Sequence, residues 1–285
     1  MPIDPNKARG AKLPDSETSY DRDRVILYHL GIGAGVPATD ANELQYTYEK
    51  NLKVLPSFAV IPGFGSMGGI ASIPGLQFNF AMLLHGEQEV ILHKPLPPAQ
   101  KLKTSAHVPE IYDKGKAALV ILEANARDES GDKLFTNRMS LFIRGEGGFG
   151  GDSGPKVGNA APERKPDGVI TRKTLPQQAL IYRLSGDRNP LHAEPAMAAL
   201  GNFSRPILHG LCTFGFAGRA VLKHFCGNDP ARFKSIRVRF SKHVFPGETL
   251  ITEMWKISDT TIIFRTKTTE RGEVVLSQAA VELQA

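Results

Sequence analysis

The chain has 285 residues, of which 41% are hydrophobic and 22% are charged, and its formal net charge is +6. These fractions are typical of a globular protein, and the length allows two domains of average size whose cores need no disulfides or metals. The basic residues are scattered, without a run of five or more Lys or Arg. The charge therefore indicates a solvated surface, or attraction of a substrate that carries phosphates, rather than nucleic-acid binding.

The N-terminal residues, Met-Pro-Ile-Asp-Pro-Asn-Lys, lack the apolar stretch of a secretory signal. No segment approaches the run of about eighteen apolar residues that a membrane span needs. The two cysteines, Cys212 and Cys226, lie in or beside an apolar segment, which favours buried free thiols over a disulfide framework. We therefore expect a cytoplasmic protein without membrane contacts.

Glycine and proline are abundant in residues 146–168, which contain few large apolar side chains. This composition is typical of a linker that crosses the surface. We expect it to separate an N-terminal domain, residues 1–145, from a C-terminal domain, residues 169–285.

A stiff polar turn is predicted where the chain reads Tyr182-Arg-Leu-Ser-Gly-Asp-Arg-Asn-Pro-Leu-His192. Pro190 has a fixed φ and no N–H, and it biases Asn189 toward an extended backbone. A carboxylate (Asp187) and an imidazole (His192) directed at one point form an acid–base pair that can add or remove water. The alternative interpretation is an ordinary turn in which Asp187 and Asn189 only cap backbone N–H groups.

Two other uses of this turn are less well supported by the sequence. A metal site at Asp187 and His192 needs at least a third ligand, and no His-x-His or His-x3-His companion occurs. Ser185 lies in Leu-Ser-Gly rather than Gly-x-Ser-x-Gly, so a nucleophilic hydrolase is not indicated. We therefore predict no metal.

Residues 211–225 are apolar on every face, with Arg219, Lys223 and His224 gathered near their end and Gly227 just beyond. This pattern predicts a buried helix that begins at Gly210, followed by alternating strands. The two halves also look like diverged copies, because a His-Gly pair, a proline-centred turn and a glycine-tipped hairpin follow in the same order in each. The stretch from His209 to Leu250 is much longer than that from His85 to Leu102.

The segment 182–192, with Ala198 beyond it, closely resembles the signature of the MaoC-like hydratases. More narrowly, it resembles the (R)-specific enoyl-CoA hydratases called hydratase 2, which include the hydratase unit of peroxisomal multifunctional enzyme type 2. Three further stretches fit the same group: Leu83-Leu-His-Gly-Glu-Gln88, Lys94-Pro-Leu-Pro97 and Pro206-Ile-Leu-His-Gly-Leu-Cys212. The resemblance implies reversible hydration of medium- or long-chain trans-2-enoyl-CoA to (3R)-3-hydroxyacyl-CoA, without a cofactor.

The resemblance also implies roles for individual residues. Asp187 and His192 are catalytic, with the roles of acid and base left open, and Asn189 orients the water or a catalytic side chain. The N–H of Gly210, at a helix N-terminus, is a ready donor to the thioester oxygen. We expect His209 to be a structural partner. The residues that correspond to acyl-CoA contacts are His85, Gly86, Lys114, Arg188 and Phe240.

The implied fold is an α+β double hot-dog, in which an antiparallel sheet wraps a central helix and the N-terminal half lacks most of that helix. We place the missing helix around residues 86–100 and expect an acyl tunnel there, lined by apolar side chains of residues 58–73 and 78–84. A homodimer and a functional link to a 3-hydroxyacyl-CoA dehydrogenase are also expected. A peroxisomal location is implied for a eukaryotic protein, although the last residues, Leu-Gln-Ala, are not a Ser-Lys-Leu address.

Three alternative functions are left open. The same chemistry run backwards is a 3-hydroxyacyl-thioester dehydratase of fatty-acid synthesis, which differs by its carrier, CoA or acyl carrier protein. A hot-dog thioesterase is less well supported, because the hydratase signature is complete. A non-catalytic acyl-CoA-binding module predicts a damaged Asp187/His192 pair, and the pair is intact.

Overall fold

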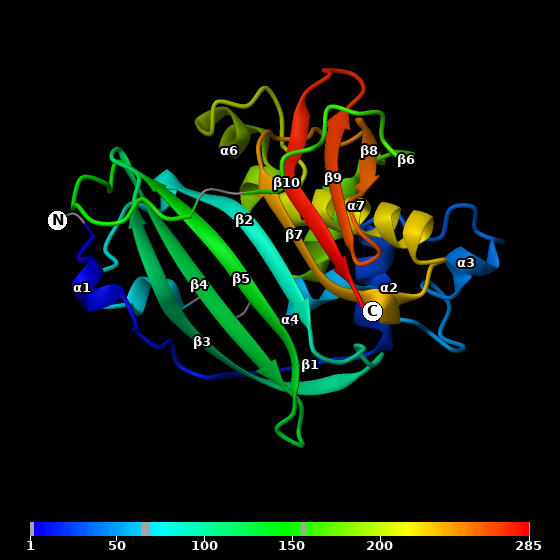
Figure 1. Ribbon diagram of the computed structural model, residues 1–285, viewed down its shortest axis with the longest axis horizontal. Helices are drawn as coiled ribbons and strands as arrows, with labels where there is room; N and C mark the ends of the chain where they lie inside the picture. Colours follow the sequence, from blue (N-terminus) through cyan, green and yellow to red (C-terminus); the bar gives the residue numbers. More distant parts are fainter. Residues whose placement is uncertain (1–2, 64–68, 156–157, 285) are drawn as a thin grey trace.

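A computed structural model describes residues 3–63, 69–155 and 158–284. Within these residues the strands form one ten-stranded antiparallel sheet in the order β1-β3-β4-β5-β2-β7-β10-β9-β8-β6 (Figure 1). The strands are β1 (Ser16–Tyr20), β2 (Leu83–Leu92), β3 (Gln100–Asp113), β4 (Ala117–Arg127), β5 (Lys133–Arg144), β6 (Gly168–Lys173), β7 (Phe233–Phe240), β8 (Thr249–Lys256), β9 (Thr261–Thr268) and β10 (Val274–Leu283).

Short helices and one long helix complete the fold. The α-helices are α1 (Pro5–Ala8), α2 (Arg22–Gly31), α3 (Ala41–Leu44), α4 (Val60–Gly63), α5 (Gln178–Tyr182), α6 (Pro195–Leu200) and α7 (Gly210–Phe225). Single 3-10 turns lie at Pro56–Ala59, Phe80–Met82, Arg183–Ser185, Pro190–His192 and Pro230–Arg232. None of the described helices is both long and apolar enough to cross a membrane.

The sheet has the same strand order in both halves when it is read outward from its centre. The first half runs β2-β5-β4-β3-β1 and the second runs β7-β10-β9-β8-β6. The halves join where β2 pairs with β7, with Val90 opposite Ile236. At this seam Glu87 binds Arg237 at 2.8 Å and Arg239 at 2.7 Å. The strand order therefore confirms the predicted double hot-dog.

The long helix of the second half confirms the prediction from residues 211–225. α7 precedes β7 and buries most of its side chains, among them Leu211, Phe214, Ala217 and Val221. The helix is apolar on every face because a helix at the centre of a hot-dog contacts protein on all sides.

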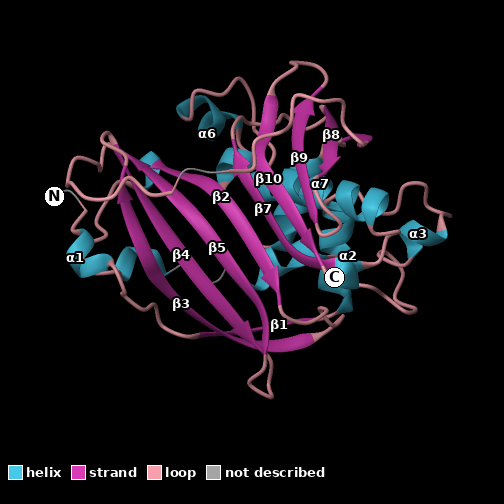
Figure 2. Cartoon of the chain, in the orientation of Figure 1, coloured by secondary structure: helices cyan, strands magenta, loops and turns pink. Residues whose placement is uncertain are grey.

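The predicted position of the missing helix was wrong. Residues 86–100 form most of β2 and the turn that follows it, and His85-Gly86 lies inside β2. His209-Gly210, in contrast, opens α7, so the two His-Gly pairs are not equivalent. α7 precedes β7 (Figure 2), whereas the described residues between α3 and β2 contain only α4 and 3-10 turns. The same two residues, His-Gly, thus occur once within a strand and once at the start of a helix, so the pair alone does not locate the helix.

Other segments cover the sheet of the first half. A second core cluster lies between β3, β4 and β5 and the side chains Leu13, Ile70, Ile73 and Leu76. Phe58, predicted to line a tunnel, is fully buried against Tyr20 and Tyr28 in the main core. Phe80 and Leu84, by contrast, are exposed. The predicted lining residues 64–68 lie outside the described part of the chain.

A segment of the first half also packs on the helices of the second. α2 contacts α5, and the side-chain amide of Gln178 donates to Gly31 O at 2.7 Å. Arg219 of α7 reaches Glu43 of α3 at 2.5 Å, and both side chains are buried. His29 is fully buried, where Nδ1–H donates to Tyr46 O and Nε2 accepts from Leu55 N–H. The halves are therefore joined by helices as well as by the sheet.

Acid should destabilise the fold through buried neutral histidines. Burial lowers the pKa of His29 from 6.5 to about 3 and that of His85 to about 4. At a pH between those values and 6.5, the unfolded chain binds protons that the folded chain does not. The contribution of these histidines to the free energy of unfolding is therefore fully present above pH 6.5 and is lost as the pH falls below it. We expect a lower urea midpoint at about pH 5 than at about pH 7.5. NMR signals of the His29 ring that titrate near 6.5 would contradict this cause.

Candidate active site

The predicted polar turn, residues 182–192, contains two 3-10 turns, Arg183–Ser185 and Pro190–His192. Asn189 has φ −52° and ψ 123°, the extended backbone expected before Pro190. Its Oδ1 accepts from Leu191 N–H at 3.0 Å and caps the turn Pro190–His192. Asp187 Oδ1 accepts from Asn189 N–H at 3.1 Å. Both side chains thus cap backbone N–H groups, while the second carboxylate oxygen of Asp187 has no partner among the described residues.

His192 lies at the end of this turn and is buried. Its Nδ1 is 2.8 Å from Ile207 O. A carbonyl oxygen can only accept, so Nδ1 carries the proton and Nε2 keeps its lone pair. Burial lowers the pKa of His192, although Ile207 O and the Asp187 carboxylate oppose this effect. The ring is therefore neutral near pH 7 and can take a proton at Nε2.

His209, which was expected to be a structural partner, contacts His192 directly. Its ring stacks on His192 with centroids 3.7 Å apart and planes 26° apart, and Nε2 lies 3.2 Å from Asp187 O. Burial, and then the proximity of His192, lower the pKa of His209 to about 3. Tyr182 packs against its ring at 4.9 Å. No sequence spacing indicates this contact, because Asp187 and His209 belong to different segments.

These side chains also form a cluster that invites comparison with a metal site. One ligand atom each of Asp187, His192 and His209 lies within 4.8 Å of the others, so the third ligand that the sequence did not show is present. However, zinc lies about 2.0–2.1 Å from a histidine nitrogen, close to the plane of the ring. Two nearly parallel rings stacked 3.7 Å apart cannot both direct lone pairs at one ion. The observed geometry favours proton transfer.

Gly210, Phe240 and His85 meet across the seam of the sheet. Gly210 is the first residue of α7, and no described residue accepts a hydrogen bond from its N–H. A Cβ placed on Gly210 would lie 3.1 Å from the Phe240 ring, which in turn contacts the His85 ring at 5.0 Å. The Nε2 atom of His85 is buried and has no hydrogen-bond partner in the described part of the chain. The first half therefore contributes a side chain that contacts the ring beside the predicted oxyanion donor.

The other predicted contacts lie elsewhere. Lys114 is in the β3–β4 turn, where its Nζ donates to Ser153 O. Arg188 is exposed, and its carbonyl accepts from Arg183 at 3.3 Å. Gly86 lies at a bulge of β2, where a Cβ would be 3.3 Å from Ser140 O. No described contact joins these residues to Asp187 or His192, so their roles stay predictions.

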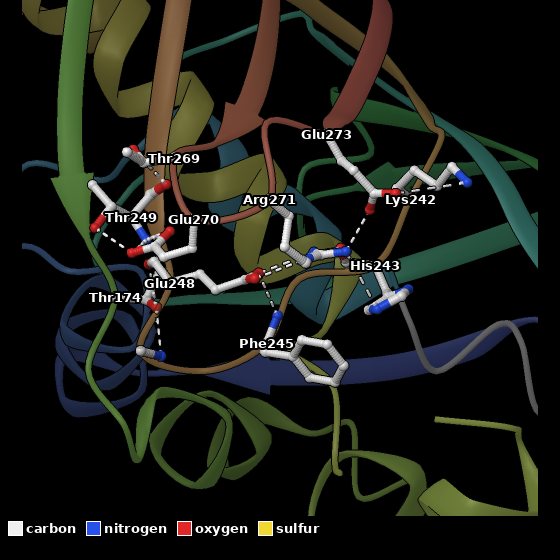
Figure 3. Close-up of polar contacts among 11 residues, drawn as sticks. Thr174, Lys242, His243, Phe245, Glu248, Thr249, Thr269, Glu270, Arg271 and Glu273 are labelled. Carbon is white, nitrogen blue, oxygen red and sulfur yellow. Dashed lines mark hydrogen bonds and ion pairs between the residues drawn. The ribbon is translucent and has the colours of Figure 1, made fainter. Parts of the chain in front are cut away.

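A polar network supports the segment that leads into α7. Leu208 N–H donates to Val244 O at 2.7 Å, within the turn between β7 and β8. Figure 3 shows how Arg271 holds this turn, with Nε donating to Glu248 at 2.6 Å and Nη2 to His243 O at 2.5 Å. Glu248 also accepts from Phe245 N–H. His209 and Gly210 therefore follow a residue that is fixed to a rigid turn.

Two family models cover most of the chain. Residues 18–145 match the MFE-2 hydratase 2 N-terminal domain, and residues 157–279 match the MaoC-like domain. The chain is 44% identical to the probable enoyl-CoA hydratase 2 of Dictyostelium discoideum, over 100% of this chain and 98% of that protein. It is 47% identical to the peroxisomal multifunctional enzyme type 2 of Mus musculus, over 97% of this chain but only 38% of the longer mouse protein.

A solved structure has the same fold over its full length. The MaoC-like dehydratase from Phytophthora capsici superposes with a TM-score of 0.87 at 37% identity, covering 98% of both chains.

Proposed function

The chain belongs to the MaoC-like family, in its hydratase 2 branch, and we propose that it is an (R)-specific trans-2-enoyl-CoA hydratase. The observation that supports this most is the intact acid–base pair, Asp187 and His192, which lies in one cluster with His209, directly before Gly210, whose N–H has no acceptor among the described residues. These are the groups that hydration of an enoyl thioester needs. A water must lose a proton as it attacks C3, C2 must gain one, and the enolate-like oxygen must be stabilised.

In the proposed reaction, the nucleophilic water lies between the Asp187 carboxylate and Nε2 of His192. The pair removes one proton from the water and delivers one to C2, and Asn189 keeps the turn in place. Gly210 N–H, aligned with the dipole of α7, donates to the thioester oxygen as negative charge develops there. The reaction proposed for these residues uses no metal or cofactor.

We extend the proposal to the substrate and its surroundings. Phe80 and Leu84, which precede His85 in the chain, are exposed and offer apolar surface to an acyl chain. Each buried methylene contributes about 0.8 kcal/mol, so decenoyl-CoA should exceed crotonyl-CoA in kcat/KM. We also propose a homodimer, a peroxisomal location in a eukaryotic cell, and a 3-hydroxyacyl-CoA dehydrogenase that consumes the product.

The dehydratase of fatty-acid synthesis is the second candidate, favoured by the similarity to the Phytophthora MaoC-like dehydratase. The carrier distinguishes the two functions. The protein should consume trans-2-decenoyl-CoA, followed as loss of enoyl absorbance, faster than the same acyl group on acyl carrier protein. The opposite preference would support the dehydratase, and inertness toward both would reject the proposed chemistry.

Replacing Gly210 by proline tests the oxyanion donor. Proline and alanine both add atoms beside Phe240, but only proline removes the N–H. Proline is well tolerated as the first residue of a helix, and His209 already has the extended ψ of 135° that a following proline requires. Gly210→Pro should therefore reduce kcat by about 10²–10³-fold relative to Gly210→Ala. Equal rates for the two variants, at equal thermal stability, would show that another group holds the oxygen.

A further inference from the structure

Two histidines tie the catalytic turn to the segment before α7 by reciprocal hydrogen bonds. His192, in the turn, donates from Nδ1 to Ile207 O at 2.8 Å. His209, in the other segment, donates from Nε2 to Asp187 O at 3.2 Å. The rings stack between these bonds at 3.7 Å. Each segment therefore supplies one imidazole donor and one carbonyl acceptor, and we call this arrangement the histidine clasp.

The clasp joins the two segments that carry the proposed catalytic groups, whose distances from one another must stay fixed. Asp187 and His192 lie on one side of it, and Gly210 directly follows His209 on the other. The catalytic turn has only single 3-10 turns around it, so few backbone bonds hold it. Of the described residues, His209 alone donates to Asp187 O. A misplacement of about 1 Å between reacting groups can cost roughly 10²-fold in rate.

His209 itself is unsuited to proton transfer near neutral pH. Burial lowers its pKa to about 3, and the nearby His192 and Arg183 add to this effect while Asp187 O opposes it. The Tyr182 ring packs on it, and its Nδ1 is buried with no described partner. A ring that stays neutral keeps one tautomer, with the proton on Nε2 where Asp187 O accepts it.

We propose that His209 is a positioning residue of the hydration reaction, which holds the Asp187/His192 pair in register with the N–H of Gly210 through the histidine clasp. This inference rests on the proposed function. It predicts that the Nε2–H donor of His209, rather than the bulk of its ring, is what the reaction depends on.

Three substitutions separate the donor from the ring. His209→Gln places an amide nitrogen as many bonds from Cα as Nε2, so the donor is kept and the ring is lost. His209→Phe keeps a ring that can stack and loses the donor. His209→Asn carries the same amide on a side chain one carbon shorter, which moves the donor away from Asp187 O. Asn and Gln have equal hydrogen-bonding capacity, so they form a matched pair.

We expect His209→Phe and His209→Asn to reduce kcat for trans-2-decenoyl-CoA by about 10–10²-fold with KM within about threefold. His209→Gln should recover most of the lost kcat. The proposal is overturned if His209→Phe is as active as the unmodified protein. It is also overturned if Gln and Asn lose equally, or if the losses follow KM and melting temperature instead of kcat.

The tautomers can be read without any substrate. In the unmodified protein at neutral pH, ¹⁵N shifts of the histidine rings should show His192 protonated on Nδ1 and His209 on Nε2, both neutral. A His209 that is protonated on Nδ1, or charged, would overturn the clasp whatever the activity. If the tautomers are as expected and the unmodified protein hydrates no enoyl-CoA, the proposed function fails while the bonds of the clasp stand.

Discussion

Alanine at Asp187 or at His192 should lower kcat for enoyl-CoA hydration by about 10²–10⁴-fold, the usual contribution of general acid–base catalysis. The Asp187 carboxylate has one oxygen in a backbone hydrogen bond and one directed at no described partner. His192 is neutral with a free Nε2. Both groups are therefore poised for proton transfer, and steady-state kinetics with trans-2-decenoyl-CoA measure the loss.

Asp187→Asn provides a sharper comparison. Its amide oxygen can still accept from Asn189 N–H, so the turn is kept while the charge is removed. We expect the asparagine variant to be nearly as inactive as the alanine variant. His93→Ala, which removes an exposed histidine of the first half, should leave kcat unchanged. Retention of most activity in Asp187→Asn or His192→Ala would refute the assignment of the acid–base pair.

Arg219→Met should destabilise the fold by about 3–5 kcal/mol, because it leaves a buried carboxylate without its cation. The side chains of Arg219 and Glu43 are only 10% and 5% exposed, and their atoms approach to 2.5 Å. Arg219 also donates to Ile32 O at 3.1 Å, whereas Gly35 N–H is the other partner of the same Glu43 oxygen. The free energy of unfolding in urea measures the effect.

An exposed ion pair provides the control for this prediction. Lys256 and Asp259 lie 2.7 Å apart with side chains 48% and 97% exposed. Lys256→Met should change stability by no more than about 1 kcal/mol, as exposed pairs usually do. Adding Glu43→Gln to Arg219→Met should restore part of the loss, since no buried charge is left. A loss for Arg219→Met as small as that for Lys256→Met would contradict the importance of this contact between the halves.

Local patterns in the sequence predicted the features that depend on neighbouring residues. Pro190 sets the extended backbone of Asn189 by sterics alone, so the polar turn could be foreseen. The all-round apolar character of residues 211–225 likewise indicated α7 before its surroundings were known. The repeated turns and hairpins in the sequence also indicated that the two halves have the same strand order.

Features that depend on distant segments were missed or misplaced. The stacking of His209 on His192 could not be predicted from the sequence. Neither the spacing nor the residue types distinguish His209-Gly210 from any other His-Gly pair. His85 was matched to His209, but hydrogen bonding to β5 makes its segment a strand. The Arg219–Glu43 pair joins residues of opposite halves. Such contacts depend on tertiary packing, which can outweigh the preferences of a short local sequence.

The configuration of the hydration product tests the central claim most directly. Incubation of the unmodified protein with trans-2-decenoyl-CoA, followed by chiral analysis of the 3-hydroxyacyl product, reports on which face of the double bond water is added. Membership of the hydratase 2 branch predicts (3R)-3-hydroxydecanoyl-CoA alone. Formation of the (3S) product, or of no product, would contradict it.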